Sequence, residues 1–390
     1  MDDPKTTLPL GLQARGRGAL ENAMGRFEGQ TRNAIADGWH PPDPQMLRTQ
    51  TRVEVARSAI SYNRSPDLPF DRAINPYRGC EHGCIYCFAR PSHAFLGLSA
   101  GLDFETQLIA RPDAPEILAQ ELRRKSYQVA PIAIGTNTDA YQPVERDRGI
   151  MRRILQVLSD FNHPVGIVTK GTLIERDIDI LAPMAARGLA RVGISVTTLD
   201  RDVSRAMEPR VPSPQRRLET IRRLSGAGIP VRVMASPMIP ALTDHELESI
   251  LEQGRAAGAI AASYIVLRLP REVSPLFQEW LQEAFPARAA RIMARVREIH
   301  GGKDYDAEWG KRMPGQGVWA DLMRKRFDAA LARTGLVKRL PDLRCDLFAP
   351  PPRSGDQLDL WGNGMSAPEN SISGGVQATS ARSSGSVEAK

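Results

Sequence analysis

Residues 75–88 read Asn-Pro-Tyr-Arg-Gly-Cys-Glu-His-Gly-Cys-Ile-Tyr-Cys-Phe and contain three of the four cysteines of the chain. Cys80, Cys84 and Cys87 have the spacing Cys-x3-Cys-x2-Cys, while Cys345 lies far downstream. A closed zinc site uses four protein ligands, and so does an ordinary electron-transfer iron–sulfur cluster. Three clustered thiolates would leave one iron of a four-iron cluster without a protein ligand. Because that iron could bind a small molecule, the spacing indicates chemistry at the cluster rather than a structural role.

Length and composition set the class of protein. With 390 residues, 42% of them hydrophobic and 25% charged, one α/β barrel of about 200–250 residues plus extensions fits as well as two domains do. No apolar run approaches the roughly 18 residues of a membrane span, and the first residues lack a secretory signal. Clustered cysteines do not suit a disulfide framework. We therefore expect a cytoplasmic protein that does not cross a membrane.

The balance of charge is basic. A net charge of +7 and a pI near 9.4 are compatible with an anionic partner such as nucleic acid. Residues 1–48 are rich in Gly, Arg, Pro and Asp, so we interpret them as a flexible basic arm. Residues 15–18 (Arg-Gly-Arg-Gly) could follow a phosphate backbone, although a solvated arm is the simpler interpretation. Thr51–Tyr62 is expected to begin the ordered part as a half-buried strand, because Val53 and Val55 alternate with polar neighbours.

After the cysteines, the sequence alternates between short apolar runs and amphipathic segments, which predict strands and helices in turn. The predicted strands are 131–135, 165–169, 192–196, 231–234 and 264–267, and one predicted helix is 174–187. Regular alternation implies parallel strands with right-handed crossovers. We therefore predict an α/β fold, a partial (β/α)6 TIM-type barrel over residues 49–272. The rival, an open doubly wound sheet, lacks a Gly-x-Gly-x-x-Gly at the start of any helix.

Three helix starts are predicted from residues with a short side-chain oxygen. Two have the capping-box spacing, and the third is a serine followed by a proline at the first helical position. The predicted caps are Asp113 with Glu116, Thr243 with Glu246, and Ser213 with Pro214.

Polar side chains collect where the predicted strands end. Working groups of such barrels sit at the carboxyl ends of the strands, so we expect a ligand site there. The residues are Thr136, Asn137, Thr138, Thr169, Lys170, Ser195, Thr197, Thr198, Ser236 and Arg268. Hydroxyls, an amide and two cations suit a ligand with a carboxylate, an amine and a ribose. The alternative for each Ser or Thr is that it caps the following helix.

Four stretches of the sequence resemble one family of enzymes. They are Asn75-Pro-Tyr-Arg-Gly-Cys80 with the cysteines that follow, Thr136-Asn-Thr-Asp-Ala-Tyr-Gln-Pro-Val-Glu145, Ile167-Val-Thr-Lys170, and Glu208-Pro-Arg-Val-Pro-Ser-Pro214. On these residues the chain is identified as a member of the radical S-adenosylmethionine superfamily. The longer strings are similar to its spore photoproduct lyase-like subgroup, often labelled DNA repair photolyases. The resemblance extends over residues 50–340 and is more specific for the cofactor than for the substrate.

The resemblance implies the cofactors. Cys80, Cys84 and Cys87 would hold a [4Fe-4S] cluster whose open iron binds the amine and carboxylate of S-adenosylmethionine. An electron from an external donor such as flavodoxin or ferredoxin would then cleave the sulfonium. The resulting 5′-deoxyadenosyl radical abstracts hydrogen from the substrate. The protein's part is to position the reactants and to exclude competing reactions.

The resemblance also assigns contacts to S-adenosylmethionine, but no catalytic residue. Thr136, Asn137 and Thr138 would hold the methionine amine, Lys170 the carboxylate as a point charge, Ser195 the ribose, and Tyr86 the adenine. Two of these residues have a simpler interpretation from the sequence. Tyr86 could pack under the cysteine loop, and Lys170 could be a solvated lysine at a strand end.

Other polar residues near the motif are given no role in the chemistry. His82 is interpreted as a neighbour of the ligands or an exposed group, and Asp139 and Glu145 as turn and helix-start residues. Spore photoproduct lyase depends on an extra cysteine between its cluster motif and its later strands. This sequence has no cysteine between Cys87 and Cys345, so the resemblance does not support the same hydrogen-return route. Cys345 lies outside the barrel pattern and is interpreted as a bystander.

Residues 273–345 are interpreted as a helical extension packed on the barrel. Aromatic and basic residues are interspersed there, which suits single-stranded or distorted nucleic acid. The alternative is a helical cap with a solvated arginine face. These residues are Trp280, Trp309, Trp319, Phe327, Arg288, Arg291, Arg295, Lys311, Arg312, Arg324, Lys325 and Arg326.

Residues 346–390 are rich in Pro, Ser, Gly and Asn and are expected to form a disordered tail. A short peptide in this tail resembles the one by which bacterial repair and replication proteins dock on the sliding clamp. Its residues are Gln357, Leu358, Asp359, Leu360 and Trp361. Apolar side chains in a polar tail have no core to join, which favours a partner groove.

Two functions of different classes follow from these observations. The first is a radical S-adenosylmethionine enzyme that acts on nucleic acid in lyase-like DNA repair, with modification of RNA or protein as the alternative within that class. The second is a non-enzymatic nucleic-acid-binding protein whose metal–thiolate loop is a structural staple.

Overall fold

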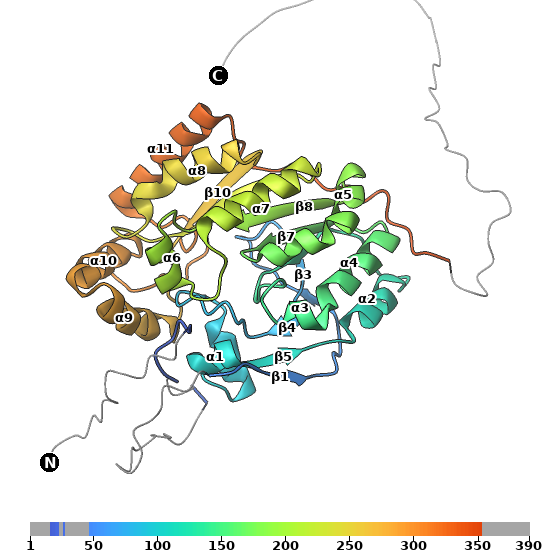
Figure 1. Cartoon of the computed structure of the whole chain (residues 1–390), viewed down its shortest axis with the longest axis horizontal. Coiled ribbons are helices and arrows are strands. Elements are labelled where there is room, and N and C mark those ends of the chain that lie inside the picture. Colours follow the sequence, from blue (N-terminus) through green and yellow to red (C-terminus); the bar gives the residue numbers. More distant parts are fainter. Residues whose placement is uncertain (1–15, 23–25, 28–46, 353–390) are drawn as a thin grey trace, which may run out of the picture. The chain divides into compact units, whose positions relative to one another are not determined.

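A seven-stranded sheet with helices packed along it forms the frame of the protein (Figure 1). The computed structural model describes residues 16–22, 26–27 and 47–352. All neighbouring strands in the order β10-β9-β8-β7-β6-β3-β2 are parallel, except for β2 with β3. The strands are β2 (Ile60–Tyr62), β3 (Arg72–Ile74), β6 (Ile132–Ile134), β7 (Val165–Thr169), β8 (Ala190–Ser195), β9 (Val231–Met238) and β10 (Ala261–Val266). Parallel strands linked by helices confirm the predicted partial barrel.

The five strands predicted after the cysteines are all present, although their ends differ by a few residues. The first parallel strand, β3, was not predicted, because its sequence Arg-Ala-Ile lies between Asp71 and Asn75 and forms no apolar run. The expected strand at 51–62 contributes parts of two strands instead, β1 (Gln50–Val53) and β2.

A second sheet, of three strands, frames the cysteine loop. It has the order β1-β5-β4, with β4 (Tyr77–Arg78) leading directly into the loop. Its central strand, β5 (Gln107–Ala110), follows the short helix α1 (Leu102–Thr106). The Cys80 N–H donates to the carbonyl of Phe104 in α1, at 2.9 Å. The loop is therefore anchored in a folded unit of its own rather than on the barrel alone.

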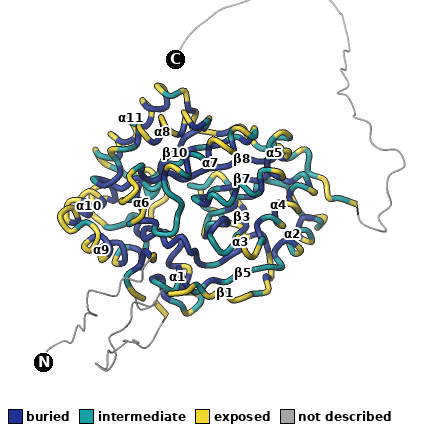
Figure 2. Tube along the Cα trace, in the orientation of Figure 1, coloured by how far each residue is buried: buried dark blue, intermediate teal, exposed yellow. Residues whose placement is uncertain are grey.

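Helices between the parallel strands bury their apolar faces against the sheet, and the buried residues run through the middle of the trace in Figure 2. The packing is close at Gly254 of α8 (Leu247–Ala256), where a Cβ atom would lie 2.7 Å from the Val233 side chain. The crossover helices are α2 (Ala114–Leu122), α4 (Ile150–Asp160), α5 (Ile178–Ala186), α7 (Pro214–Gly226) and α8 (Leu247–Ala256). This layer holds the carboxyl ends of the strands in a fixed arrangement.

Asp113, Ser213 and Thr243 stand at the predicted N-cap positions of α2, α7 and the 3-10 helix η3 (Asp244–Glu246), but only one of their side chains caps its helix. The Ser213 hydroxyl accepts from the Arg216 N–H at 3.4 Å and caps α7, as predicted. Both predicted capping boxes are wrong. The Asp113 carboxylate accepts instead from the Ala56 N–H at 3.0 Å, and the Thr243 hydroxyl accepts from a backbone N–H that precedes it, at 3.0 Å. More distant backbone groups therefore compete successfully for the same oxygens.

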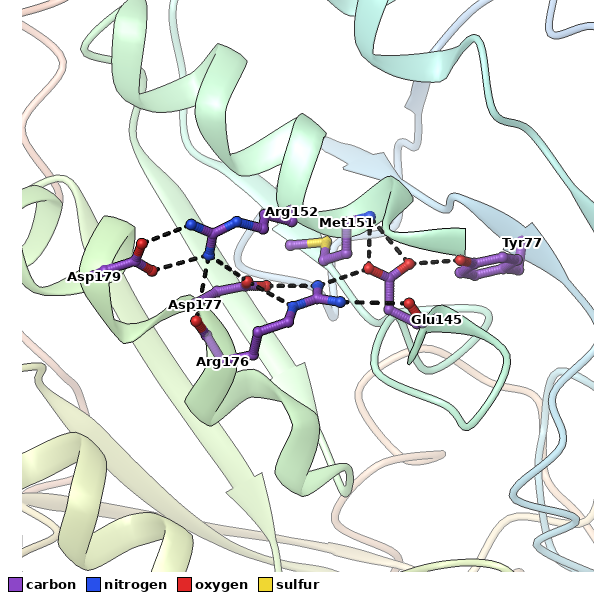
Figure 3. A network of polar contacts seen from close by, with 7 residues as sticks. All are labelled: Tyr77, Glu145, Met151, Arg152, Arg176, Asp177 and Asp179. Atoms are coloured by element: carbon purple, nitrogen blue, oxygen red, sulfur yellow. Dashed lines mark hydrogen bonds and ion pairs between the residues drawn. The ribbon is translucent and has the colours of Figure 1, made fainter. Parts of the chain in front are cut away.

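The predicted helix at 174–187 is divided at Asp177 into a 3-10 helix, η2 (Thr172–Asp177), and α5. The Asp177 side chain is fully buried and accepts hydrogen bonds from Arg152 at 3.0 Å and from Arg176 at 2.8 Å. These contacts belong to the polar network of Figure 3.

The same network reaches the start of the cysteine loop (Figure 3). Arg176 donates to the buried Glu145 carboxylate at 2.8 Å, and the Tyr77 hydroxyl of β4 donates to the other oxygen of that carboxylate at 2.5 Å. Glu145 begins the short helix α3 (Glu145–Arg148), as predicted. Because its carboxylate binds both Tyr77 of β4 and Arg176 of η2, Glu145 also connects the strand before the cysteines to the barrel.

After β10, the chain forms three further helices and then returns beneath the sheet. The helices are α9 (Val273–Ala284), α10 (Pro286–Ile299) and α11 (Gly317–Thr334). The Arg344 N–H then donates to the carbonyl of Gly188, just before β8, and the Ala349 N–H donates to Phe161, both at 3.0 Å. Residues 346–352, expected in the disordered tail, are thus packed at the amino-terminal ends of the strands. No helix in the described residues is long and apolar enough to span a membrane.

Candidate cofactor site

Three free cysteines lie in one loop at the carboxyl ends of the parallel strands. Successive turns shape this loop, because the Gly83 N–H donates to Cys80, and the Cys87 N–H donates to Cys84, at 3.3 and 3.2 Å. Gly83 has φ +65°, and a Cβ atom there would lie 2.6 Å from the Glu105 carboxylate. The turn between the first two cysteines therefore requires glycine.

A buried ion pair supports the loop from below. Arg90 and Glu105 have no exposed side-chain surface, and their charged groups are 2.5 Å apart. Arg90 also donates to the carbonyl oxygens of Cys84 and Gly83. The Glu105 carboxylate also accepts hydrogen bonds from the backbone N–H groups of residues 18 and 19, both at 2.9 Å. That stretch was expected in a solvated arm, but its backbone fills the remaining acceptor positions of a buried carboxylate.

The end of β6 holds one side of the loop. The buried Thr138 hydroxyl donates to the carbonyl of Gly79, at 2.7 Å. The Asn137 N–H and the Thr136 hydroxyl both contact the Asn75 side chain, at 3.1 and 3.4 Å. The three predicted residues therefore lie beside the loop, with Thr138 engaged by the loop backbone and Asn137 exposed.

A buried histidine–carboxylate pair lies under the motif. His82 is 2% exposed, and its Nδ1 lies 3.3 Å from the Asp139 carboxylate. Burial alone would raise the pKa of Asp139, but His82 and hydrogen bonds from Thr169 and from the Lys170 N–H lower that pKa well below its usual range. The pair connects the loop to the ends of β6 and β7. His82 is thus a buried neighbour of the ligands rather than an exposed group.

The residue before Cys87 points into the protein. Tyr86 is 6% exposed, and its hydroxyl donates to the Glu208 carboxylate. Glu208 also accepts from Thr197 at 3.1 Å, and its other oxygen lies 2.9 Å from Arg217 in a fully buried ion pair. This arrangement favours the interpretation of Tyr86 as packed under the loop. Sequence reasoning gave no role to Glu208 or Arg217, although the Glu-Pro-Arg-Val-Pro-Ser-Pro string marked their region.

Lys170 reaches this inner side from the end of β7. Its Nζ lies 5.7 Å from the centroid of the Tyr86 ring. Burial alone would lower the pKa of Lys170, but the neighbouring acidic groups of Cys84, Glu208 and Asp139 raise it. Lys170 is therefore a charged group within the site and not a solvated lysine at a strand end.

Ser195 ends β8 on the same side of the loop. It is 4% exposed, and its carbonyl accepts from Arg217 at 3.0 Å. Because Arg217 also pairs with Glu208, Ser195 and Tyr86 are connected through one buried ion pair. The sequence-predicted residues thus form two groups, with Thr136–Thr138 on one side of the loop and Tyr86, Lys170 and Ser195 on the other.

The residue after Cys87 has the opposite orientation from Tyr86. The Phe88 side chain is 45% exposed. Arg268, beyond the end of β10, places its guanidinium carbon 4.4 Å from the centroid of the Phe88 ring, a cation–π contact. Two aromatic residues around one cysteine therefore each contact a cation, one inside the protein and one at its surface.

The cysteines suit a multi-iron cluster better than a single ion. Burial raises the pKa of the Cys80 thiol, and the acidic groups of Asp139, Cys84 and Cys87 raise it further. Among the described residues, no three His, Cys, Asp or Glu side chains are arranged to hold one metal ion. Three thiols with no fourth ligand fit a [4Fe-4S] cluster with one open iron.

Cys345 lies at the other end of the barrel. The N–H of its neighbour Arg344 donates to the carbonyl of Gly188, which precedes β8, and the Ala349 N–H donates to the carbonyl of Phe161, which precedes β7. The cysteine loop is at the carboxyl ends of these strands. Cys345 is therefore not positioned to return a hydrogen atom to a substrate at the loop.

Most of the aromatic and basic residues of the extension have internal partners. Trp280 is 4% exposed and Phe327 6%, so both belong to the core. Arg312 is paired with Asp67 at 2.6 Å, while Trp309 remains 60% exposed. The extension is mainly a cap on the barrel, which favours the alternative to a nucleic-acid surface.

Comparison with known sequences identifies the family. The sequence model of the Radical SAM superfamily matches residues 74–254. An uncharacterized protein of Mycobacterium tuberculosis is 38% identical over 290 residues, which cover 69% of this chain and 84% of that protein. An uncharacterized protein of Methanocaldococcus jannaschii is 25% identical over 232 residues, which cover 59% of this chain and 82% of that protein.

Structural comparison agrees on the fold. Spore photoproduct lyase complexed with dinucleoside spore photoproduct superposes with a TM-score of 0.52 and 14% sequence identity. The match covers 73% of this chain and 79% of that one. At this level of identity, the likeness concerns the architecture of the barrel and not its substrate.

Proposed function

Since this chain belongs to the radical S-adenosylmethionine superfamily, we propose that it acts on nucleic acid, in a lyase-like DNA-repair reaction. The observation that carries the proposal is the gathering of three free thiols with cations on both sides of them, Lys170 inside and Arg268 outside. A cation at the surface beside Cys87 suits an anionic substrate, as does the net charge of +7. A protein of similar fold has been captured with a dinucleoside lesion, which supports the same class of substrate.

Different residues of the site would bind the cluster and S-adenosylmethionine. Cys80, Cys84 and Cys87 would hold the [4Fe-4S] cluster, which with S-adenosylmethionine supplies a 5′-deoxyadenosyl radical after reduction by an external donor such as flavodoxin or ferredoxin. Lys170 would bind the methionine carboxylate as a point charge. Tyr86, whose hydroxyl is fixed by a carboxylate, would orient Lys170.

The remaining contacts lie at the ends of β6 and β8. Thr136 and Asn137 would accept hydrogen bonds from the methionine amine through their side-chain oxygens, since Thr138 is engaged by the loop backbone. Ser195 would contact the ribose. The proposal contains no cysteine-mediated return of hydrogen, because Cys345 lies at the opposite ends of the strands.

Anaerobic reconstitution tests the enzyme and its substrate together. We expect one [4Fe-4S] cluster per chain and release of 5′-deoxyadenosine after reduction with dithionite. Damaged oligodeoxynucleotides carrying deuterium should then transfer it to 5′-deoxyadenosine, whereas undamaged ones should not. Deuterium transfer only from RNA or from a peptide would replace DNA by the alternative substrate within this class.

The tail peptide is a separate hypothesis. Residues 357–361 lie outside the described part of the chain. We propose that they bind the bacterial sliding clamp. The full chain should then be retained on immobilised clamp, and a version that lacks residues 356–362 should not be retained. Equal retention of both versions would refute this.

A further inference from the structure

Phe88 is an unusual residue for its position. It directly follows a cluster cysteine, yet 45% of its side chain is exposed. A single exposed aromatic side chain is ordinary on a protein surface, but this ring lies next to a cluster cysteine and in contact with a cation. Tyr86, on the other side of the same cysteine, shows that the loop is able to bury an aromatic ring fully.

Arg268 covers part of this ring but has no acidic partner of its own. Its guanidinium forms no ion pair with any described residue, and the hydrogen bond of its Nη1 goes to the Met313 sulfur at 3.4 Å, a weak acceptor. Asp67 attracts Arg268 electrostatically, but its ion pair is with Arg312, at 2.6 Å, so two cations share one carboxylate. A half-buried cation that is only partly compensated is costly, and an anionic ligand would lower that cost.

The pairing of groups identifies the kind of ligand. A planar guanidinium binds phosphate through two parallel hydrogen bonds, which a lysine does not offer. An aromatic face beside it stacks on a nucleobase without regard to sequence. A phosphate joined to a base satisfies both groups at once, whereas an acidic peptide satisfies only the arginine.

We propose that Phe88 and Arg268 form a nucleotide subsite beside the cysteine loop. The base stacks on the exposed part of the Phe88 ring, and the adjoining phosphate binds the Arg268 guanidinium. This inference rests on the proposed function, since it names the part of a nucleic-acid substrate that lies next to Cys87. Lys170 contacts Tyr86 on the inner side, so the methionine carboxylate and the substrate phosphate have different cations.

Binding of a fluorescent single-stranded oligodeoxynucleotide to the reconstituted full chain tests the subsite, by anisotropy over a range of KCl concentrations. Arg268→Gln should weaken binding about tenfold and lower the salt slope by about one. Phe88→Leu should weaken binding about tenfold through lost stacking and leave the slope unchanged. Arg124→Gln is the matched control. It removes one exposed charge after α2, at the amino-terminal side of the sheet, and should leave both quantities unchanged.

Equilibrium dialysis with labelled S-adenosylmethionine separates the competing explanations. Wild-type affinity in both variants is expected. If Arg268→Gln loses S-adenosylmethionine but keeps the oligonucleotide, the guanidinium serves the cofactor and the subsite is refuted. If the wild-type chain binds the oligonucleotide and neither variant weakens it, the subsite alone fails. If the wild-type chain binds an acidic peptide and no oligonucleotide, the proposed function fails with it.

Discussion

On each side of Cys87 an aromatic ring contacts a cation, but the burial and the partners of the two pairs differ. On the inner side, Tyr86 is buried, its hydroxyl is bound to Glu208, and Lys170 lies among acidic groups. On the outer side, Phe88 is exposed, and Arg268 has no acidic partner among the described residues. Internal partners make the inner side part of the stable fold, whereas the outer side has unused interactions. Stability and recognition are thus assigned to neighbouring residues of one loop.

Removing Cys87, the cysteine between the two sides, should have the largest effect. Cys87→Ala leaves two of the three loop thiols, so we expect loss of the cluster and of all 5′-deoxyadenosine release. Iron analysis and the absorbance of the reconstituted protein measure the loss. Cys345→Ala is the control, and it should keep full iron content because that thiol lies at the far ends of the strands. A Cys87→Ala protein with a normal cluster would contradict the ligand assignment.

The inner side should respond mainly in stability. Glu208→Gln removes the charge that compensates Arg217 in a fully buried pair, and breaking such a pair costs about 3–5 kcal/mol. Urea unfolding of the full chain should show this decrease in the free energy of unfolding. Replacing both residues, as Glu208→Gln with Arg217→Met, should recover part of the loss. A single variant as stable as the wild type would mean that the pair is not a structural element.

Lys170 should affect the cofactor more than the fold. A hydrogen bond to a charged group contributes about 1.5–3 kcal/mol, so Lys170→Gln should weaken S-adenosylmethionine binding by about tenfold to a hundredfold. Equilibrium dialysis measures the affinity, and iron content shows that the cluster is retained. Unchanged affinity in a protein with a complete cluster would remove Lys170 from the cofactor site.

The smallest effect is expected on the outer side, in stability. Arg268→Gln relieves the cost of a half-buried cation but loses its cation–π contact with Phe88; the two effects oppose each other, so the free energy of unfolding should stay within about 0.5 kcal/mol of the wild type. Urea unfolding under the conditions used for Glu208→Gln makes the two sides directly comparable. A loss as large as that of Glu208→Gln would show that Arg268 is a structural residue, and the contrast between the two sides would disappear.

Local patterns predicted the parts of this protein that depend on near neighbours. The cysteine spacing, five of the parallel strands and the Ser213 cap could each be inferred from a few consecutive residues. Glu208 could not, because its partner Tyr86 is 122 positions away. Asp113 had the local signature of a cap, but its oxygens accept from a residue 57 positions away. The buried charges that organise the site are therefore properties of the tertiary fold.

The stretch at residues 16–19 has a further consequence for the chemistry. Gly18 lies so close to the loop that a Cβ atom there would be 1.8 Å from the Gly83 carbonyl oxygen. The turn between Cys80 and Cys84 is thus covered by backbone that belongs to no helix or strand. Burial of that turn therefore depends on a peptide about 65 positions earlier in the sequence, which is held there by two hydrogen bonds to the Glu105 carboxylate.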